Sequence, residues 1–322
     1  MLTTTQLQAA QSIVYRHMQP TATFNWPGLS NVLGAQLWLK HENHTPIGAF
    51  KVRGGLVFAE NLAHSGFDGE LVTATRGNHG QSIPYGACRI GLDVTVYVPH
   101  GNSREKNAAM RHWGANLVEF GRDFDEARLE AARVAQERGA MLVPSFDERL
   151  VQGVATYGAE LFDGVDGLDR IYVPIGMGSG ACSLIWLRDL LGLPTEIFGV
   201  VSSRADAMAR SIEAGTIVET EDAKTFADGM ATRVPHPQAF DIMAAGLAGV
   251  VRVSDEEIAQ AIRLIFEHTH NVAEGAGAAA VAAALQQKDA LSGKRVAAIL
   301  TGGNIDREWF AQILNGGVPI PG

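Results

Sequence analysis

The sequence predicts an α/β protein with two parallel-sheet domains and a cleft between them. From residue 70 onward, short apolar segments that suit buried strands alternate with segments that suit helices, which is the pattern of parallel βαβ units. A second series of the same kind starts after residues 144–149, and a chain of 322 residues is too long for one small core. Ligands of such folds bind beyond the carboxyl ends of the strands, so we expect a site in the cleft.

The expected elements follow from the hydrophobic pattern. Before the regular series, the pattern predicts a helix at 5–16, a strand at 35–40 and a helix at 52–64. The first series has strands at 71–75, 94–98, 116–120 and 141–143, and helices at 80–90, 104–113 and 124–138. The second has strands at 170–175, 197–201 and 295–300, and helices at 151–162, 181–191, 255–268 and 275–287. We interpret the alanine-rich segment 276–285 as a closely packed helix rather than a linker.

Composition excludes several classes of function. The net charge of −9 and the lack of basic clusters argue against a nucleic-acid or anionic-membrane surface. Two cysteines, Cys88 and Cys182, do not form a disulfide framework and suit a reducing compartment. The first residues lack the pattern of a signal peptide, and no stretch is long and apolar enough to span a bilayer. We therefore expect a cytoplasmic protein.

Lys51 is the first residue with a candidate chemical role. It lies in the segment Gly-Ala-Phe-Lys-Val-Arg-Gly-Gly at 48–55, after the turn-forming residues Thr45, Pro46 and Gly48. Such a turn can hold a lysine at the start of a helix, with its amine in a cleft. A desolvated amine loses its proton more readily and can form a Schiff base with an aldehyde. By itself, the motif is a weak signal, because most lysines are solvated surface residues and that interpretation is by far the more common one.

Two loops between strands and helices are candidate anion sites. Residues 75–81, Thr-Arg-Gly-Asn-His-Gly-Gln, open a helix whose first amides suit a carboxylate or phosphate, and Asn78 can donate to a ligand oxygen. The glycines of the segment 176–180, Gly-Met-Gly-Ser-Gly, let backbone amides approach an anion. This second loop lacks the dinucleotide-binding spacing, so a compact phosphate site is the better interpretation. Ordinary structural turns remain the alternative at both places.

Three further features are weak when taken singly. Thr301, in the segment Thr-Gly-Gly-Asn at 301–304, follows the last expected strand, where its hydroxyl can meet a ring nitrogen of a ligand. Asp228 lies in an Ala-Asp-Gly loop and carries little information alone. Glu274 opens a helix, and an acid at that position usually only complements the helix dipole.

Together the motifs fit one ligand, the phosphorylated aromatic aldehyde pyridoxal phosphate. Their order along the chain, from about Leu37 to Asn304, resembles that of the fold-type II pyridoxal-phosphate enzymes of the threonine/serine dehydratase and serine racemase group. The resemblance implies the tryptophan synthase β-like architecture, with the cofactor in the cleft. Residues 1–69 and 148–322 would form a large cofactor-binding domain, and residues 70–147 a small inserted domain. It also implies a homodimer.

The resemblance assigns roles to individual residues. Lys51 would form the Schiff base and move the substrate proton, Phe50 would pack beside the ring, Asn78 would bond the ring hydroxyl and Thr301 would contact the ring nitrogen. The phosphate would be held by Gly176, Met177, Gly178, Ser179 and Gly180. The substrate carboxylate would be received by the backbone amides of Thr75, Arg76, Gly77, Asn78 and His79.

The sequence also departs from the family pattern. Arg76 stands where serine racemase has a serine on the opposite face of the substrate, and an arginine is a poor base, which argues against racemisation. Arg76 could instead recognise a second substrate anion, pack over an aromatic substituent or form a structural salt bridge. Val201 and Ala207 occupy the positions of the family's cation-binding acids, so we expect no metal. The chain ends at Gly322 without room for a regulatory domain, so we expect no isoleucine feedback.

We therefore expect a lyase of amino-acid catabolism that removes water and then ammonia from a β-hydroxy amino acid to give a 2-keto acid. Threonine and serine are the default substrates, and Arg76 makes phenylserine and 3-hydroxyaspartate competitors. One alternative is a racemase or β-replacement enzyme on the same cofactor. A different class of alternative is a non-catalytic protein that binds a nucleotide or another ligand.

Overall fold

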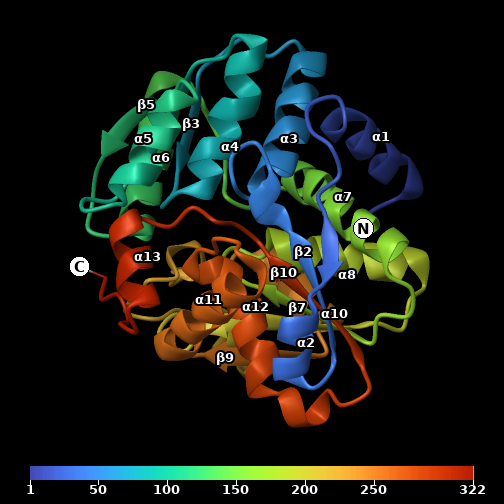
Figure 1. The fold of residues 1–322 in the computed structure, drawn as a ribbon. Coiled ribbons are helices and arrows are strands. Elements are labelled where there is room, and N and C mark those ends of the chain that lie inside the picture. The colour runs from blue at the N-terminus through green and yellow to red at the C-terminus, as the bar shows by residue number, and fades with distance from the viewer. Residues whose placement is uncertain (322) are drawn as a thin grey trace.

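Two separate β-sheets organise residues 1–321, the part of the chain that the computed structural model describes (Figure 1). The larger sheet has the strand order β1-β2-β10-β7-β8-β9 and the smaller one β5-β4-β3-β6. The larger sheet consists of β1 (Thr23–Asn25), β2 (Gln36–His41), β10 (Arg295–Leu300), β7 (Arg170–Pro174), β8 (Glu196–Ser202) and β9 (Gly249–Val253). The smaller sheet consists of β5 (Asn116–Glu119), β4 (Val94–Val98), β3 (Leu71–Ala74) and β6 (Met141–Leu142). All neighbouring strands are parallel except β1 and β2.

Helices precede, connect and cover the strands. They are α1 (Thr4–Val14), α2 (Pro27–Leu33), α3 (Lys51–Ser65), α4 (Asn78–Ala87), α5 (Arg104–His112), α6 (Phe124–Arg138), α7 (Glu148–Gly164), α8 (Ser179–Leu191), α9 (Ala207–Ala214), α10 (Pro237–Gly246), α11 (Asp255–Thr269), α12 (Gly275–Gln286) and α13 (Arg307–Leu314). Short 3₁₀ helices lie at η1 (Glu42–His44), η2 (Cys88–Ile90), η3 (Asp228–Met230) and η4 (Lys288–Ala290). No helix in the described part of the chain is long and apolar enough to cross a membrane.

The predicted α/β class is confirmed, and each predicted strand and helix is present within a few residues of its expected bounds. The sequence did not predict β1, β9, α2, α9, α10 and α13. These elements have between three and ten residues, too few to show a clear period of two or 3.6. The regular series was easier to recognise because it contains buried and mostly apolar strands such as Val94–Val98 and Leu71–Ala74.

Two separate parts of the chain form the larger sheet: β1 and β2 come before the strands of the smaller sheet, and β7 to β10 come after them. The early strand β2 pairs with the last strand, β10, and all strands of the smaller sheet lie between residues 71 and 142. We therefore propose that residues 70–147 form an inserted small domain and that residues 1–69 and 148–322 form the large one. Figure 1 shows the elements of residues 71–142 grouped apart from the larger sheet.

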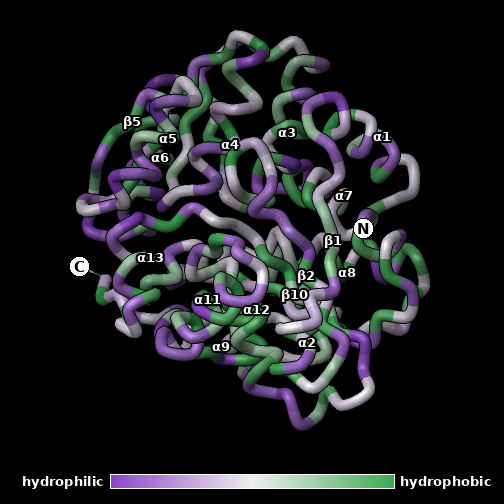
Figure 2. Tube along the Cα trace, viewed as in Figure 1, coloured by the Kyte–Doolittle hydropathy of each residue, from purple (hydrophilic) through white to green (hydrophobic). Residues whose placement is uncertain are grey.

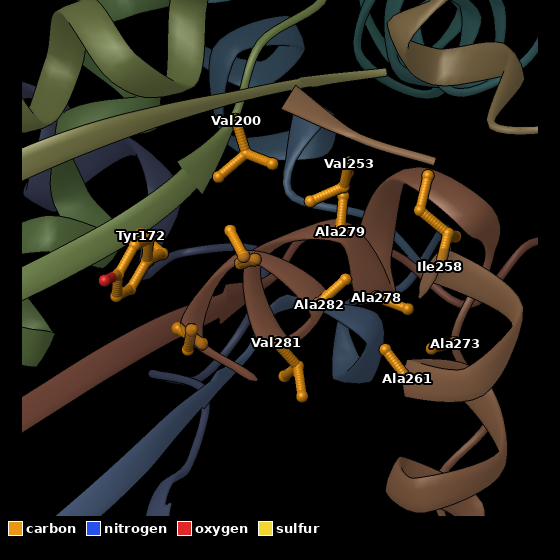
Figure 3. Packing of buried hydrophobic residues seen from close by; sticks show 14 of the residues in the cluster. Tyr172, Val200, Val253, Ile258, Ala261, Ala273, Ala278, Ala279, Val281 and Ala282 are labelled. Carbon is orange, nitrogen blue, oxygen red and sulfur yellow. The ribbon is translucent and has the colours of Figure 1, made fainter. Parts of the chain in front are cut away.

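The core of the large sheet is built around α12. Its residues from Gly275 to Ala284 are all buried, which confirms that the alanine-rich segment is a closely packed helix. Figure 3 shows Ala279 next to Val253 of β9, and Ile258 and Ala261 of α11 beside the same helix. Val200 of β8 and Ala282 belong to the same cluster. Small side chains allow the helix to lie against both neighbours. Along outer helices such as α11, hydrophobic and hydrophilic residues alternate, as expected where one face is buried (Figure 2).

Helix α3, which begins with Lys51, is packed unusually close to its neighbours. A side chain at Gly55 would place its Cβ 2.3 Å from the carbonyl oxygen of Ser82 in α4. At Gly54 the Cβ would be 2.8 Å from the carbonyl oxygen of Leu150 in α7. The two glycines that follow Arg53 therefore let the backbones of α3, α4 and α7 approach one another closely.

A buried ionic cluster holds the same helix. Arg53, fully buried in α3, forms two hydrogen bonds to Glu42 and two to Glu160 of α7, at distances of 2.6–2.9 Å. Lys40 donates to Glu160 at 2.5 Å and to the carbonyl oxygen of Thr21 at 2.7 Å. Two cations thus face two carboxylates, and the segments that surround the start of α3 are tied together.

We predict that Arg53→Leu lowers the free energy of unfolding by about 3–5 kcal/mol, because it leaves buried carboxylates without their partner. Arg16→Leu is the matched control. It breaks the more exposed Arg16–Glu60 pair, found at 2.6 Å, and should cost less than about 1 kcal/mol. Urea unfolding of both variants measures the difference. Equal losses would show that the cluster does not hold the fold together.

Candidate active site

A cleft lies where the carboxyl ends of β3, β7 and β10 come together. Its lining includes Thr75 after β3, the loop 176–180 after β7 and Thr301 after β10, with Lys51 among them. Its empty volume, open mouth included, is about 790 Å³, within the usual range of small-molecule sites. The structure therefore brings together all of the loops that the sequence singled out as candidate ligand contacts.

Backbone bonds place Lys51 beside the end of β10. The amide of Phe50 donates to the carbonyl oxygen of Thr301 at 3.0 Å, and that of Gly303 donates to Gly48 at 2.9 Å. Gly48 has a positive φ of 69°, and a Cβ there would lie 2.7 Å from Oδ1 of Asn304. Only glycine suits this turn. The turn residues that precede Lys51 thus join the lysine segment to the strand end that carries Thr301.

The amine of Lys51 has no acidic partner among residues 1–321. Its Nζ donates to the hydroxyl of Ser179 at 2.9 Å, and it lies 5.1 Å from the centre of the Phe50 ring. Burial lowers the pKa of Lys51 to about 8. The chain has six lysines, and the other two that reach the interior, Lys40 and Lys106, are both ion-paired. Burial also lowers the pKa of Lys40, but Lys40 is ion-paired with Glu160. Among these three, Lys51 alone combines a lowered pKa with the lack of an acidic partner in residues 1–321.

The loop 176–180 opens helix α8 and carries no charged side chain. Ser179 is the first residue of this helix, and the first helical bond runs from the amide of Cys182 to Gly178. The amides of Ser179 to Ala181 therefore have no acceptor within the helix. An anion bound here would be held by backbone N–H groups and the helix dipole. Because Lys51 contacts Ser179, the amine and this anion site adjoin.

The loop 75–79 follows β3 of the smaller sheet and opens helix α4. Two of its amides are already occupied, since Thr75 donates to Tyr97 and Gly77 donates to the hydroxyl of Thr75. The amides of Asn78 and His79 have no acceptor within the helix. Of the amides expected to receive a carboxylate, these two are the best placed.

Two side chains of this loop differ in their surroundings. Burial, and then the charge of Lys51, lower the pKa of His79 to about 3, so its imidazole is neutral and only its amide can attract an anion. Neither ring nitrogen of His79 has a hydrogen-bond partner in residues 1–321. Asn78 donates to Glu274 at 2.6 Å and accepts from Asn304 at 2.8 Å. One N–H of Asn78 remains for a ligand.

The structure also shows a buried group that the sequence interpretation underrated. Lys106 of α5 donates to both carboxylate oxygens of Asp228 at 2.6 and 2.8 Å, and to Glu274 at 3.2 Å. Burial alone would lower the pKa of Lys106, but the two nearby acids outweigh burial and raise it. Burial raises the pKa of Glu274. Asp228 and Glu274 seemed uninformative singly, and Lys106 was not singled out. No local pattern links three segments so far apart in the chain.

The residues present fit pyridoxal phosphate. An aldehyde needs a nucleophilic amine, and Lys51 supplies one without a carboxylate to hold it protonated. A phosphate needs an anion site beside that amine, and the start of α8 supplies one. Thr301, which is 4% exposed, lines the same cleft with a neutral hydroxyl. The observed arrangement can therefore bind an aldehyde covalently and hold its anionic group nearby.

Comparison with known proteins agrees with this chemistry. Residues 14–302 match the family model described as pyridoxal-phosphate dependent enzyme. An L-threonine ammonia-lyase of Geobacter sulfurreducens is 34% identical over 100% of this chain and 80% of its own length. An L-threo-3-hydroxyaspartate ammonia-lyase of Saccharomyces cerevisiae is 29% identical over 95% of this chain and 94% of its own. The crystal structure of a T.th. threonine deaminase, 30% identical, covers 95% of this chain and 99% of that one with a TM-score of 0.87.

The low pKa of Lys51 predicts the pH dependence of cofactor uptake by the apoprotein. Only the neutral amine attacks an aldehyde, so the rate should rise about fivefold from pH 7 to pH 8 and less than about twofold from pH 9 to pH 10. Stopped-flow absorbance after mixing apoprotein with pyridoxal phosphate measures this rate. A rate that continues to rise steeply above pH 9 would indicate a lysine of ordinary pKa and contradict the assignment.

Proposed function

The chain belongs to the pyridoxal-phosphate-dependent enzyme family and has its fold-type II architecture, and on this premise we propose that it converts a β-hydroxy amino acid to a 2-keto acid. The observation that supports this most directly is the unpaired amine of Lys51 beside the anion site of α8. The overall change removes water, takes water up again on hydrolysis, and releases ammonium. Threonine and serine are the default substrates, with phenylserine and 3-hydroxyaspartate as competitors.

We propose which residues would bind the cofactor from the positions of these residues in the cleft. Pyridoxal phosphate, when bound to an amino acid, withdraws electrons from the α-carbon and makes the α-proton acidic. Lys51 would carry it covalently, and the amides of 176–180 would hold its phosphate. Phe50 would lie beside the ring, Thr301 would contact the ring nitrogen and Asn78 would bond the ring hydroxyl. The neutral hydroxyl of Thr301 does not force a proton onto that nitrogen as a carboxylate would.

Lys51 is proposed as the residue that moves the substrate's α-proton. Once released from the cofactor, its Nζ would take this proton, because burial lowers the pKa of the amine to about 8, so that about half of it is neutral at pH 8. The amides of Asn78 and His79 would bind the substrate carboxylate at the start of α4 and so orient the α-carbon. The electron pair left at the α-carbon would then form a double bond to the β-carbon as the C–O bond breaks. The proton taken by Lys51 balances the departing hydroxide, so that the two together leave as water.

Racemisation and β-replacement on the same cofactor are the alternatives within the family. Racemisation needs a second acid–base group on the opposite face of the substrate. Arg76 stands at the expected place, and a guanidinium does not give up its proton in proteins. The non-catalytic nucleotide-binding alternative receives no support from the site, because the loop 176–180 suits one phosphate and lacks a dinucleotide-binding spacing.

Two further points stay proposals. We propose a homodimer, for which light scattering should give about twice the chain mass of 34.4 kDa. We also propose a cytoplasmic location, which suits the free thiols of Cys88 and Cys182.

We predict that the holoenzyme releases a 2-keto acid and ammonia from at least one β-hydroxy amino acid. Lys51→Ala should lower kcat by at least about 1,000-fold, because it removes the proton acceptor. The matched control is Lys288→Ala, which replaces an exposed lysine and should have no effect. A coupled dehydrogenase assay for the keto acid measures both variants. Turnover that survives in folded Lys51→Ala, verified by circular dichroism, would overturn the assignment.

A further inference from the structure

We infer that Arg76 binds a second carboxylate of the substrate, and that the natural substrate is therefore a β-hydroxy amino acid with an acidic side chain, of the 3-hydroxyaspartate type. This inference rests on the proposed function and narrows its substrate class. It is based on which charged side chains line the cleft and on which of them have a partner of opposite charge.

Arg76 is a cation for which the protein supplies no anion. It lines the cleft, its Nε is buried, and this atom has no hydrogen-bond partner in residues 1–321. Nor does its guanidinium form an ion pair with any carboxylate of that part of the chain. The structure therefore removes the salt-bridge interpretation that the sequence left open. A buried guanidinium N–H without an acceptor is costly, which favours a role in binding a ligand.

The other charges of the cleft have their own partners. Lys106 lies between Asp228 and Glu274, and Asn78 donates to the second oxygen of Glu274. Lys51 is kept without an acid. Arg76 is thus the one cation of the cleft, among the described residues, that is both permanently charged and unpaired.

The position of Arg76 suits a carboxylate on the substrate's side chain. It follows β3 and lies two residues before Asn78, whose amide is proposed to bind the α-carboxylate. In 3-hydroxyaspartate the second carboxylate is attached to the carbon that bears the hydroxyl, two carbons from the first. Because Arg76 lies next to the proposed α-carboxylate site, its side chain can reach the second carboxylate of the substrate. A guanidinium presents a planar fork that matches both oxygens of a carboxylate.

An aromatic substituent is a weaker partner for Arg76. A phenyl ring would contact the face of the guanidinium but would leave its N–H groups without acceptors. Threonine offers only a methyl group at the same place. A carboxylate alone satisfies both the charge and the donors.

The test compares Arg76→Gln with the wild-type holoenzyme on 3-hydroxyaspartate, threonine and phenylserine. Wild type should prefer 3-hydroxyaspartate, and the variant should lower the ratio of kcat/KM for 3-hydroxyaspartate over threonine by about tenfold to hundredfold. Arg76→Lys keeps the positive charge but lacks the planar guanidinium, so its ratio of kcat/KM should lie between those of wild type and Arg76→Gln. Arg111→Gln, which removes an exposed arginine of α5, is the matched control for net charge and should leave the ratio unchanged.

A binding measurement gives a readout that does not depend on turnover. Succinate carries two carboxylates and no amine, whereas butyrate has the same number of carbons and one carboxylate. Calorimetry should show that the wild-type holoenzyme binds succinate at least about tenfold more tightly than butyrate, and that Arg76→Gln abolishes this difference. The affinity for pyridoxal phosphate should be the same in both proteins.

The outcomes separate this inference from the proposed function. Failure of wild type to release keto acid from any of the three amino acids would overturn the proposed function, and the succinate measurement would still decide the role of Arg76. An unchanged substrate ratio in Arg76→Gln, or equal binding of succinate and butyrate by wild type, would overturn the inference alone. A loss of cofactor affinity in Arg76→Gln would also overturn it, because Arg76 would then bind the phosphate.

Discussion

The pairing of charges around Lys51 is the constraint on which the rest of the site depends. A buried amine stays reactive only if no carboxylate nearby holds its proton, yet the interior of this protein contains several carboxylates. Asp228 and Glu274, which line the cleft, are matched by Lys106, and Glu42 and Glu160, in the cluster beside α3, are matched by Arg53. Lys51 is left with the hydroxyl of Ser179 as its hydrogen-bond partner. Burial can then lower its pKa to about 8.

The same contacts join the parts of the cleft. The lysine segment is bonded to the end of β10, Lys51 touches the start of α8, and Asn78 at the start of α4 is bonded to Glu274 and Asn304. Lys106 comes from α5, which lies among the strands of the smaller sheet in the chain, whereas Asp228 and Glu274 lie in the segment between β8 and β10 of the larger sheet. The ion pairs of Lys106 therefore link the parts of the chain that form the two sheets. A change at one of these contacts is expected to disturb more than one binding role.

Much of the fold and part of the site were predictable from the sequence. Buried parallel strands give apolar segments such as Val94–Val98, which are easy to recognise in a sequence. Ligand-binding loops follow the carboxyl ends of such strands. The motifs at Lys51, Asn78, Gly176 and Thr301 could therefore be found from their positions relative to the expected strands. The partners of Lys106 could not, because Asp228 and Glu274 are 122 and 168 residues away and neither has a distinctive neighbourhood. Nor could the sequence decide whether Arg76 forms a salt bridge, because this depends on whether the fold places a carboxylate near its guanidinium.

Lys51 is proposed as the one lysine that carries the cofactor, and every other assignment in the cleft depends on it. The measurement that tests this most directly is borohydride reduction of the holoenzyme, followed by peptide mapping by mass spectrometry. We predict one modified lysine, Lys51, with the added mass of reduced pyridoxal phosphate. Modification of Lys40 or Lys106 instead, or of no lysine in a protein that retains its cofactor, would contradict the proposal.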